Sequence, residues 1–205
     1  MISQNNEAAS VFGYLRGLIK RFVREWGPSL IIAFAIAMVI RTFVIQAFKI
    51  PTGSMRMTLV EGDRIFVSKF RYGAKVPFTK VRLPGFGKPQ RGDVVVFIYP
   101  EDTKRDFIKR LIAFDGETVE IRDGDIYING KEVMDPPIKN LYYYNRGEYG
   151  QAGKKVKVPK GYYFVLGDNS ASSKDGRYWG FFPEDFLIGK AEVIYWPLNR
   201  IRFVQ

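Results

Sequence analysis

The chain has 205 residues and a net charge of +11, with 46% hydrophobic and 16% aromatic residues. It contains neither histidine nor cysteine, which excludes disulfides, zinc sites built on these ligands, and Ser-His-Asp or Cys-His catalysis. Any hydrolytic base is therefore Lys, Asp, Glu or Tyr. No metal or other cofactor is expected, and the sequence has no basic tail or recognition-helix pattern that indicates nucleic-acid binding.

The N-terminal residues 1–27 have a basic amphipathic pattern. Within residues 11–26, VFGYLRGLIKRFVREW, apolar side chains recur at i, i+3 and i+4, while arginine and lysine occupy the rest of the helix surface. Such a helix often lies at a membrane face, although an ordinary surface helix has the same pattern.

Residues 28–47 form a largely apolar segment that is predicted to be a transmembrane anchor. Twenty helical residues at ~1.5 Å each span the ~30 Å hydrocarbon core of a bilayer. A buried core helix and a cleavable signal peptide are the alternatives, but Ile45-Gln46-Ala47 does not fit the small-x-small pattern of a cleavage site. The basic residues before the segment predict a single-pass protein with a cytoplasmic N-terminus, so residues 48–205 lie outside.

The remainder of the chain is predicted to be mostly β. Period-two patterns predict strands at 63–70, 93–99, 106–114, 117–123 and 162–168, and Asn129-Gly130 predicts a two-residue hairpin turn. The fold class expected is a transmembrane helix followed by an antiparallel β-sheet domain, with a smaller β insertion at about 124–160.

Ser54 lies in the stretch KIPTGSMRMTL, immediately after the apolar segment. A serine that follows glycine is commonly a turn residue. As a nucleophile, it has a hydroxyl two residues away on Thr52 and a turn at Gly53 that lets the backbone approach a ligand. A hydroxyl and a backbone N–H beside the nucleophile are the groups that an oxyanion hole requires.

Lys109 lies between two large apolar residues on one face of the strand predicted at 106–114. Phe107, Lys109 and Leu111 share this face because side chains alternate along a strand. Two interpretations are open: an edge-strand lysine whose amine extends to solvent, or a desolvated lysine. Burial lowers a lysine pKa, so a desolvated Lys109 is a candidate base for Ser54.

A third polar stretch, GDNSASSKDGRYWGFFP, covers residues 167–183. It has the composition of a surface turn. Alternatively, Asp175 and Arg177 pair to brace a loop from which a serine hydroxyl orients the lysine.

In this order, and after an N-terminal anchor, the three stretches resemble bacterial type I signal peptidases. The resemblance covers about residues 40–70, 91–120 and 161–196. It implies a membrane-anchored serine endopeptidase of the cytoplasmic (inner) membrane. Such an enzyme cleaves signal peptides from exported preproteins after A-x-A-like sites with a Ser/Lys dyad.

The resemblance also implies individual roles. Ser54 would be the nucleophile and Lys109 the general base, while Thr52 and the Ser54 amide would form the oxyanion hole. Ser173 would hydrogen-bond the lysine. Asp175 and Arg177 would hold the loop.

The family binds its substrate as an extended strand, whose small side chains enter shallow apolar pockets. These pockets would be lined by Phe48, Ile50, Pro51, Met55, Leu59, Val96, Phe107 and Ile108. The partners expected are secretory preproteins and the lipid bilayer. The sequence specifies no oligomeric state.

The chain departs from the family pattern at four positions. Met57 replaces the usual proline three residues after the serine, Ser170 and Ala171 replace a charged pair, and Gly176 replaces a serine. These departures bear on loop rigidity and substrate range. Two alternatives stay open: a Ser/Lys processing protease of narrow specificity, and a non-enzymatic anchored β-module that binds extended peptides.

Overall fold

The computed structural model describes residues 3–77, 79 and 81–205, and it divides after Thr42 into a helical unit and a β-domain. Helix α1 covers Ser3–Val39 and continues as a π-helical turn over Ile40–Val44. Among the described residues, one helical segment, Leu15–Val44, is long and apolar enough to cross a membrane. Its mean hydropathy reaches 2.0, and none of its most apolar part is buried in the protein.

One helix, α1, covers the described part of the expected amphipathic segment and most of the expected anchor, with Pro28 inside it. The last three residues of the expected anchor, 45–47, belong to strand β1, where they pair with β2. Backbone hydrogen bonding to β2 therefore ends the helical segment at Val44.

The β-domain is built on an antiparallel sheet in the order β1-β2-β11-β3-β4-β9-β10, with β12 paired to β11. The predicted mostly antiparallel β fold is confirmed, and β2, β3, β4 and β9 lie where strands were expected. The strands of this sheet are β1 (Ile45–Lys49), β2 (Arg64–Ser68), β3 (Val94–Ile98), β4 (Asp106–Ala113), β9 (Tyr162–Leu166), β10 (Phe181–Pro183), β11 (Leu187–Trp196) and β12 (Arg202–Phe203).

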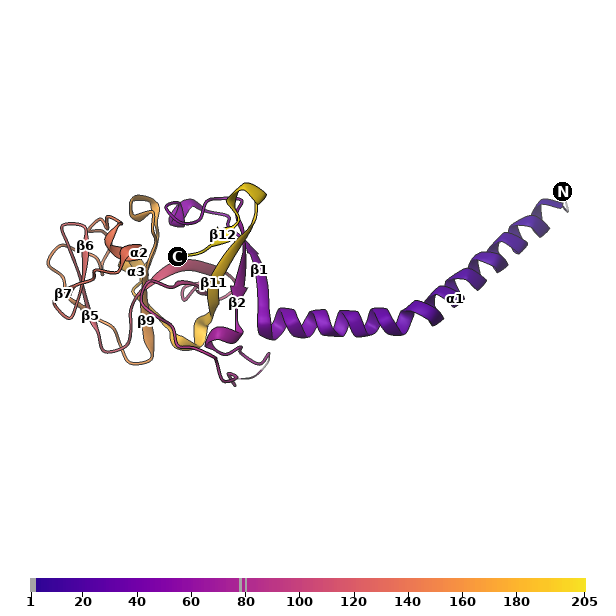
Figure 1. Cartoon of the computed structure of the whole chain (residues 1–205), viewed down its shortest axis with the longest axis horizontal. Helices are drawn as coiled ribbons and strands as arrows, with labels where there is room; N and C mark the ends of the chain where they lie inside the picture. The colour runs from indigo at the N-terminus through magenta and orange to yellow at the C-terminus, as the bar shows by residue number, and fades with distance from the viewer. Residues whose placement is uncertain (1–2, 78, 80) are drawn as a thin grey trace. The chain divides into compact units, whose positions relative to one another are not determined.

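A second, smaller sheet has the order β7-β6-β5-β8. Figure 1 shows β5, β6 and β7 at one end of the β-domain, away from β1 and β2. The predicted hairpin is present: Asn129 and Gly130 have φ values of 53° and 80°, as a two-residue turn of this kind requires. The elements of this region are β5 (Thr118–Arg122), β6 (Asp125–Ile128), β7 (Lys131–Glu132), α2 (Pro136–Lys139) and β8 (Val156–Lys157). The small sheet begins before residue 124, because β6 and β8 pair with opposite edges of β5.

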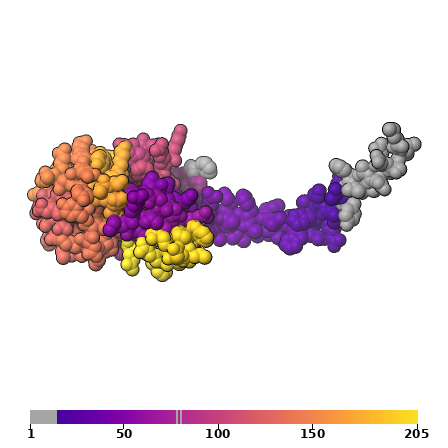
Figure 2. All heavy atoms as spheres, turned by 90° about the horizontal axis from the view of Figure 1, so that it is seen from above, coloured from indigo at the N-terminus to yellow at the C-terminus, as the bar shows by residue number. Residues whose placement is uncertain are grey.

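Strand β4 is paired with a neighbouring strand on both sides over only part of its length. The part that is paired on only one side determines where a site can form. Strand β4 pairs with β3 along Asp106–Arg110, but with β9 only from Arg110 onward. The backbone of residues 106–109 therefore lies at an opening in the sheet beyond the end of β9. The C-terminal residues, yellow in Figure 2, lie on the surface of the β-domain, where the Val204 amide donates to the Glu192 carbonyl.

Candidate active site

Ser54 lies in a loop, residues 50–63, that we call the nucleophile loop. Its base is closed by two backbone hydrogen bonds, from Ile50 N to Asp63 O (2.8 Å) and from Gly62 N to Ile50 O (2.9 Å). The buried Asp63 carboxylate accepts from the Arg200 guanidinium at 2.8 and 3.0 Å. The loop is therefore fixed at both ends, and Ser54 is held in a short 3₁₀ turn over Gly53–Met55.

The side chains of Ser54 and Lys109 meet at the opening in the sheet. Lys109 Nζ donates to Ser54 Oγ at 2.7 Å and to the Ile108 carbonyl at 2.9 Å. Lys109 is only 3% exposed and Ser54 only 8% exposed. Of the two interpretations of Lys109, the structure contradicts the edge-strand lysine with a solvent-exposed amine and agrees with the buried one.

Burial lowers the pKa of Lys109 from its ordinary value of 10.5 to about 8. The negative charges of Asp175 and Asp168 act in the opposite direction and keep this pKa from falling further. A buried amine with this pKa is half neutral at about pH 8. It can then accept a proton from a hydroxyl within hydrogen-bonding distance.

The turn that carries Ser54 is held from outside by Asn169. The Asn169 side-chain amide donates to the Gly53 carbonyl at 2.8 Å, and its backbone N–H donates to the Ser54 carbonyl at 3.0 Å. The first N–H groups of a helical turn have no partner within that turn, so the Ser54 amide is suited to bind an oxyanion. Thr52 precedes the turn in an extended conformation and is exposed.

Asp175 and Arg177 form a buried ion pair, as predicted. Both side chains are 0% exposed, and Asp175 accepts from Arg177 Nε and Nη2, each at 2.8 Å. Asp175 also accepts from the Gly167 amide at 2.9 Å, while Arg177 donates to the Tyr144 carbonyl at 2.9 Å. The pair therefore links the two ends of the 167–177 loop to the insertion.

The hydrogen bond expected between Ser173 and Lys109 is not formed. Ser173 is 7% exposed, and its hydroxyl has no hydrogen-bond partner among the described residues. It packs against the Gly167 backbone, where an added Cβ would lie 2.1 Å from Ser173 Oγ. The lysine amine donates to Ser54 and to the Ile108 carbonyl, whereas Ser173 Oγ lies against the Gly167 backbone.

A second buried ion pair, Arg110 with Asp168, was not predicted. Arg110 Nε and Nη2 donate to the Asp168 carboxylate at 2.8 and 2.6 Å, and both side chains are almost fully buried. Arg110 also donates to Thr58 Oγ1 at 3.0 Å. One signal for this pair was available in the sequence: an arginine next to Lys109 in a strand must point to the opposite face, where it needs a buried acid.

An apolar pocket is present beside the nucleophile, and six of the eight residues expected there line it. This hollow of about 40 Å³ is also lined by Lys49, Ile65 and Asp106. The six are Phe48, Ile50, Pro51, Val96, Phe107 and Ile108. Met55 and Leu59 do not line it. Both are 0% exposed and pack in the core with Val67 and Val94, because the turn that directs the Ser54 hydroxyl to Lys109 directs Met55 and Leu59 into the core.

No group of three His, Cys, Asp or Glu side chains among residues 3–77, 79 and 81–205 could hold a metal ion. The site brings together a serine hydroxyl and a buried amine, with backbone amides nearby.

Over residues 23–196 the chain matches the family described as signal peptidase, peptidase S26. It is 36% identical over 186 residues to signal peptidase I T of Bacillus subtilis (strain 168), covering 87% of this chain and 88% of the relative. The chain belongs to the signal peptidase S26 family. It is also 34% identical over 207 residues to signal peptidase I of Pseudomonas fluorescens, covering 84% of this chain and 73% of the relative. A crystal structure of a signal peptidase I from Enterococcus faecalis V583 has 37% identity and a TM-score of 0.41, covering 50% of this chain and 96% of that chain.

Because it belongs to the signal peptidase family, the chain is a serine endopeptidase that cleaves signal peptides. Its substrates are preproteins that carry signal peptides. The N-terminal segment that could cross a membrane agrees with an anchored enzyme.

Two departures from the family pattern have a structural explanation. Ser170 is buried, and its hydroxyl accepts from Arg177 Nη1 at 2.7 Å and from the Tyr144 amide at 2.8 Å, so it belongs to the network around the buried ion pair. At Gly176, an added Cβ would lie 2.7 Å from the Val165 carbonyl. The 167–177 loop is thus tightly packed despite these replacements.

Proposed function

We propose that the chain cleaves signal peptides with a Ser/Lys dyad in which Ser54 is the nucleophile and Lys109 is the general base. The observation that supports this most directly is the 2.7 Å hydrogen bond between Lys109 Nζ and Ser54 Oγ at a buried position. The lowered pKa of Lys109 adds to it, because a protonated amine cannot act as a base.

The reaction begins with neutral Lys109. One of its N–H groups donates to the Ile108 carbonyl, which leaves the nitrogen lone pair able to accept the Ser54 hydroxyl proton. As that proton moves to Nζ, Ser54 Oγ bonds to the scissile carbonyl carbon, and the C=O electron pair moves to the oxygen. The Ser54 amide and the Thr52 hydroxyl donate to this oxyanion.

Collapse of the intermediate breaks the C–N bond and releases the mature chain. The departing amine takes the proton from the Lys109 ammonium, which leaves an acyl ester on Ser54 and a neutral lysine. Water then donates its proton to Lys109 and attacks the ester, and the same proton returns to Ser54 Oγ as the signal peptide leaves.

The signal-peptide side of the substrate would bind as an extended strand at the opening beside residues 106–109. The unpaired backbone there can hydrogen-bond a peptide strand, the binding mode of β-augmentation. The adjoining hollow of about 40 Å³ has room for a methyl-sized side chain but not for a large one. We therefore propose cleavage after A-x-A-like sites.

We further propose that residues 28–44 anchor the enzyme in the cytoplasmic membrane as a single span. Arg16, Lys20, Arg21 and Arg24 precede the span, and such a cluster stays on the cytoplasmic side. The β-domain is then extracytoplasmic, where exported preproteins emerge.

The experiment is cleavage of a reporter preprotein by the full chain in detergent or lipid, with Ser54→Ala and Lys109→Met as matched variants. Wild type is expected to cut after a small residue, while both variants remain folded and inactive. Cleavage by Lys109→Met would exclude the lysine as base. If wild type binds the signal peptide without cutting it, a non-enzymatic peptide-binding module becomes the better account. If it cuts only a few of many signal peptides, the narrow processing protease is favoured.

A further inference from the structure

The substrate residues that follow the cleaved bond have no assigned place in the site described so far. We propose that the first residues of the mature chain bind in a groove between the nucleophile loop, strand β12 and helix α2, with Met57 as the contact nearest to the reacting serine. This inference rests on the proposed function and extends it to the other side of the scissile bond.

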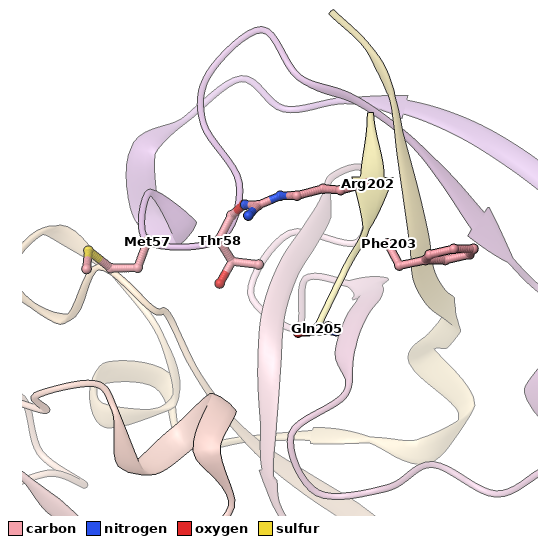
Figure 3. A pocket seen from close by; sticks show the side chains of 5 residues that line it. All are labelled: Met57, Thr58, Arg202, Phe203 and Gln205. Atoms are coloured by element: carbon pink, nitrogen blue, oxygen red, sulfur yellow. The ribbon is translucent and has the colours of Figure 1, made fainter. Parts of the chain in front are cut away.

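The groove consists of two adjoining hollows of about 320 and 570 Å³, which share Met57, Thr58 and Gln205. Figure 3 shows Met57 and Thr58 on one side of the first hollow, and Arg202 and Phe203 on the other. The second hollow continues to the insertion, where the wall is formed by Pro136, Pro137, Asn140 and Leu141. Together the hollows have room for several residues of an extended peptide.

The chain leads from the nucleophile to the groove through two successive turns within residues 53–59. Arg56 N donates to Gly53 O at 3.2 Å, and Thr58 N donates to Met55 O at 2.8 Å. Three residues of chain span at most about 10 Å. Met57, which follows Ser54 by three residues, therefore lies within about 10 Å of it along the chain.

This arrangement indicates the direction in which the substrate chain passes Ser54. The small apolar hollow is lined by residues 48–51, which precede Ser54 in the nucleophile loop, whereas the groove begins at Met57, which follows it. An extended peptide advances about 3.3 Å per residue. A chain that enters through the small hollow and passes Ser54 thus reaches Met57 with its second or third residue after the cleaved bond.

The side chains in the groove favour an apolar, uncharged occupant. Met57 is 68% exposed, and its flexible thioether adapts to apolar side chains of different shape. Arg110 is engaged by Asp168, and Arg202 donates to the Thr58 carbonyl at 2.7 Å. Both guanidinium groups therefore already have partners, while the side-chain amides of Asn140 and Gln205 can hydrogen-bond a peptide backbone.

The absence of cysteine from the chain makes a direct test available. In the full-length Ser54→Ala enzyme, which retains an uncut substrate, a single cysteine is introduced by Met57→Cys or Asn140→Cys. A short bismaleimide then links it to a preprotein with one cysteine at position −3, +2, +3 or +8. Phe48→Cys is the matched variant for the signal-peptide side, and the exposed Leu83→Cys is the negative control.

We expect the two groove cysteines to couple at +2 and +3 at least tenfold more than at −3, and Phe48→Cys to show the reverse preference. If Phe48→Cys couples at −3 while the groove cysteines do not exceed Leu83→Cys, the groove inference fails and the proposed function stands. If Phe48→Cys does not couple either, the whole proposed substrate path is wrong, and the groove inference fails with it. Coupling of the groove cysteines mainly at −3 would also overturn the inference.

A kinetic readout separates binding in the groove from support of the serine turn. Met57→Ala in the otherwise native enzyme should lower kcat/KM about fivefold for preproteins with leucine at +2 and +3. For preproteins with serine at both positions, kcat/KM should fall much less. An equal loss for both substrates would mean that Met57 acts on the nucleophile geometry, and would contradict the inference.

Discussion

Replacing Lys109 by methionine removes the amine, keeps most of the side-chain length, and should make the protein inactive but more stable below pH 8. One pKa unit corresponds to about 1.4 kcal/mol. Burial that lowers the Lys109 pKa from 10.5 to about 8 therefore costs the charged form about 3 kcal/mol in the folded state. The variant also loses the hydrogen bonds to Ser54 and to the Ile108 carbonyl, each contributing about 1 kcal/mol. A net gain of about 1–2 kcal/mol is expected.

The pH dependence of this gain has a definite sign. Below pH 8 the lysine is protonated in both states, so the cost of burying its charge is fully present. Between pH 8 and 10.5 the unfolded chain binds more protons than the folded one, and the stability of wild type rises relative to the variant. Above pH 10.5 the amine is neutral in both states, and only the loss of the hydrogen bonds distinguishes the two proteins.

The two assays are urea unfolding of both proteins from pH 6 to 10, and the pH profile of wild-type kcat/KM. Comparison with the variant removes the contributions of other titrating groups, which the two proteins share. Cleavage should rise tenfold per pH unit and level off around pH 8, since the base must be neutral. The reasoning is refuted if cleavage still rises steeply above pH 9.5, or if Lys109→Met is less stable than wild type at pH 6.

Three further predictions concern the groups around the dyad. Thr52→Val should lower kcat by about 10²–10³ with little change in KM, whereas Thr52→Ser should retain most of the activity; a loss confined to KM would argue against an oxyanion role. Asp175→Asn removes a charge that raises the Lys109 pKa, so the pH of half-maximal cleavage should fall below 8; the variant should also lose about 3–5 kcal/mol of unfolding free energy in urea titrations, and an upward shift of the profile would contradict the assignment. Gly53→Ala places a Cβ 2.5 Å from Arg56 Nε and 2.8 Å from Glu61 Oε1; cleavage should fall, and should recover partly in Gly53→Ala/Arg56→Ala, because Arg56 is exposed and can be removed without disturbing the core.

Much of the fold could be predicted because it depends on local pattern. Period-two runs located β2, β3, β4, β5 and β9, and Asn129-Gly130 located a hairpin, since a two-residue turn requires positive φ at both positions. The apolar run indicated a segment able to cross a membrane. Its end at Val44 was not predictable from hydropathy, because the apolar residues that follow it pair with β2 instead of continuing the helix.

The candidate site was predictable in its residues but not in its contacts. Absence of histidine limited the base to a few residue types, and alternation along β4 placed Lys109 on an apolar face. Two contacts were assigned wrongly. Ser173 does not reach the lysine, and Met55 and Leu59 lie in the core instead of the pocket. These errors concern side-chain direction within irregular loops, where no period relates neighbouring residues.

The sequence by itself determined which chemistry is possible: a serine and a lysine, no histidine, and no cysteine. Only the tertiary structure decided that the two side chains meet. Ser54 and Lys109 are 55 residues apart in the chain, and their contact depends on where β9 stops pairing with β4 and on how Asn169 and two buried ion pairs hold the loops around that opening. Such long-range packing has no local signature, because each buried charge is stabilised by a partner that the chain supplies from elsewhere.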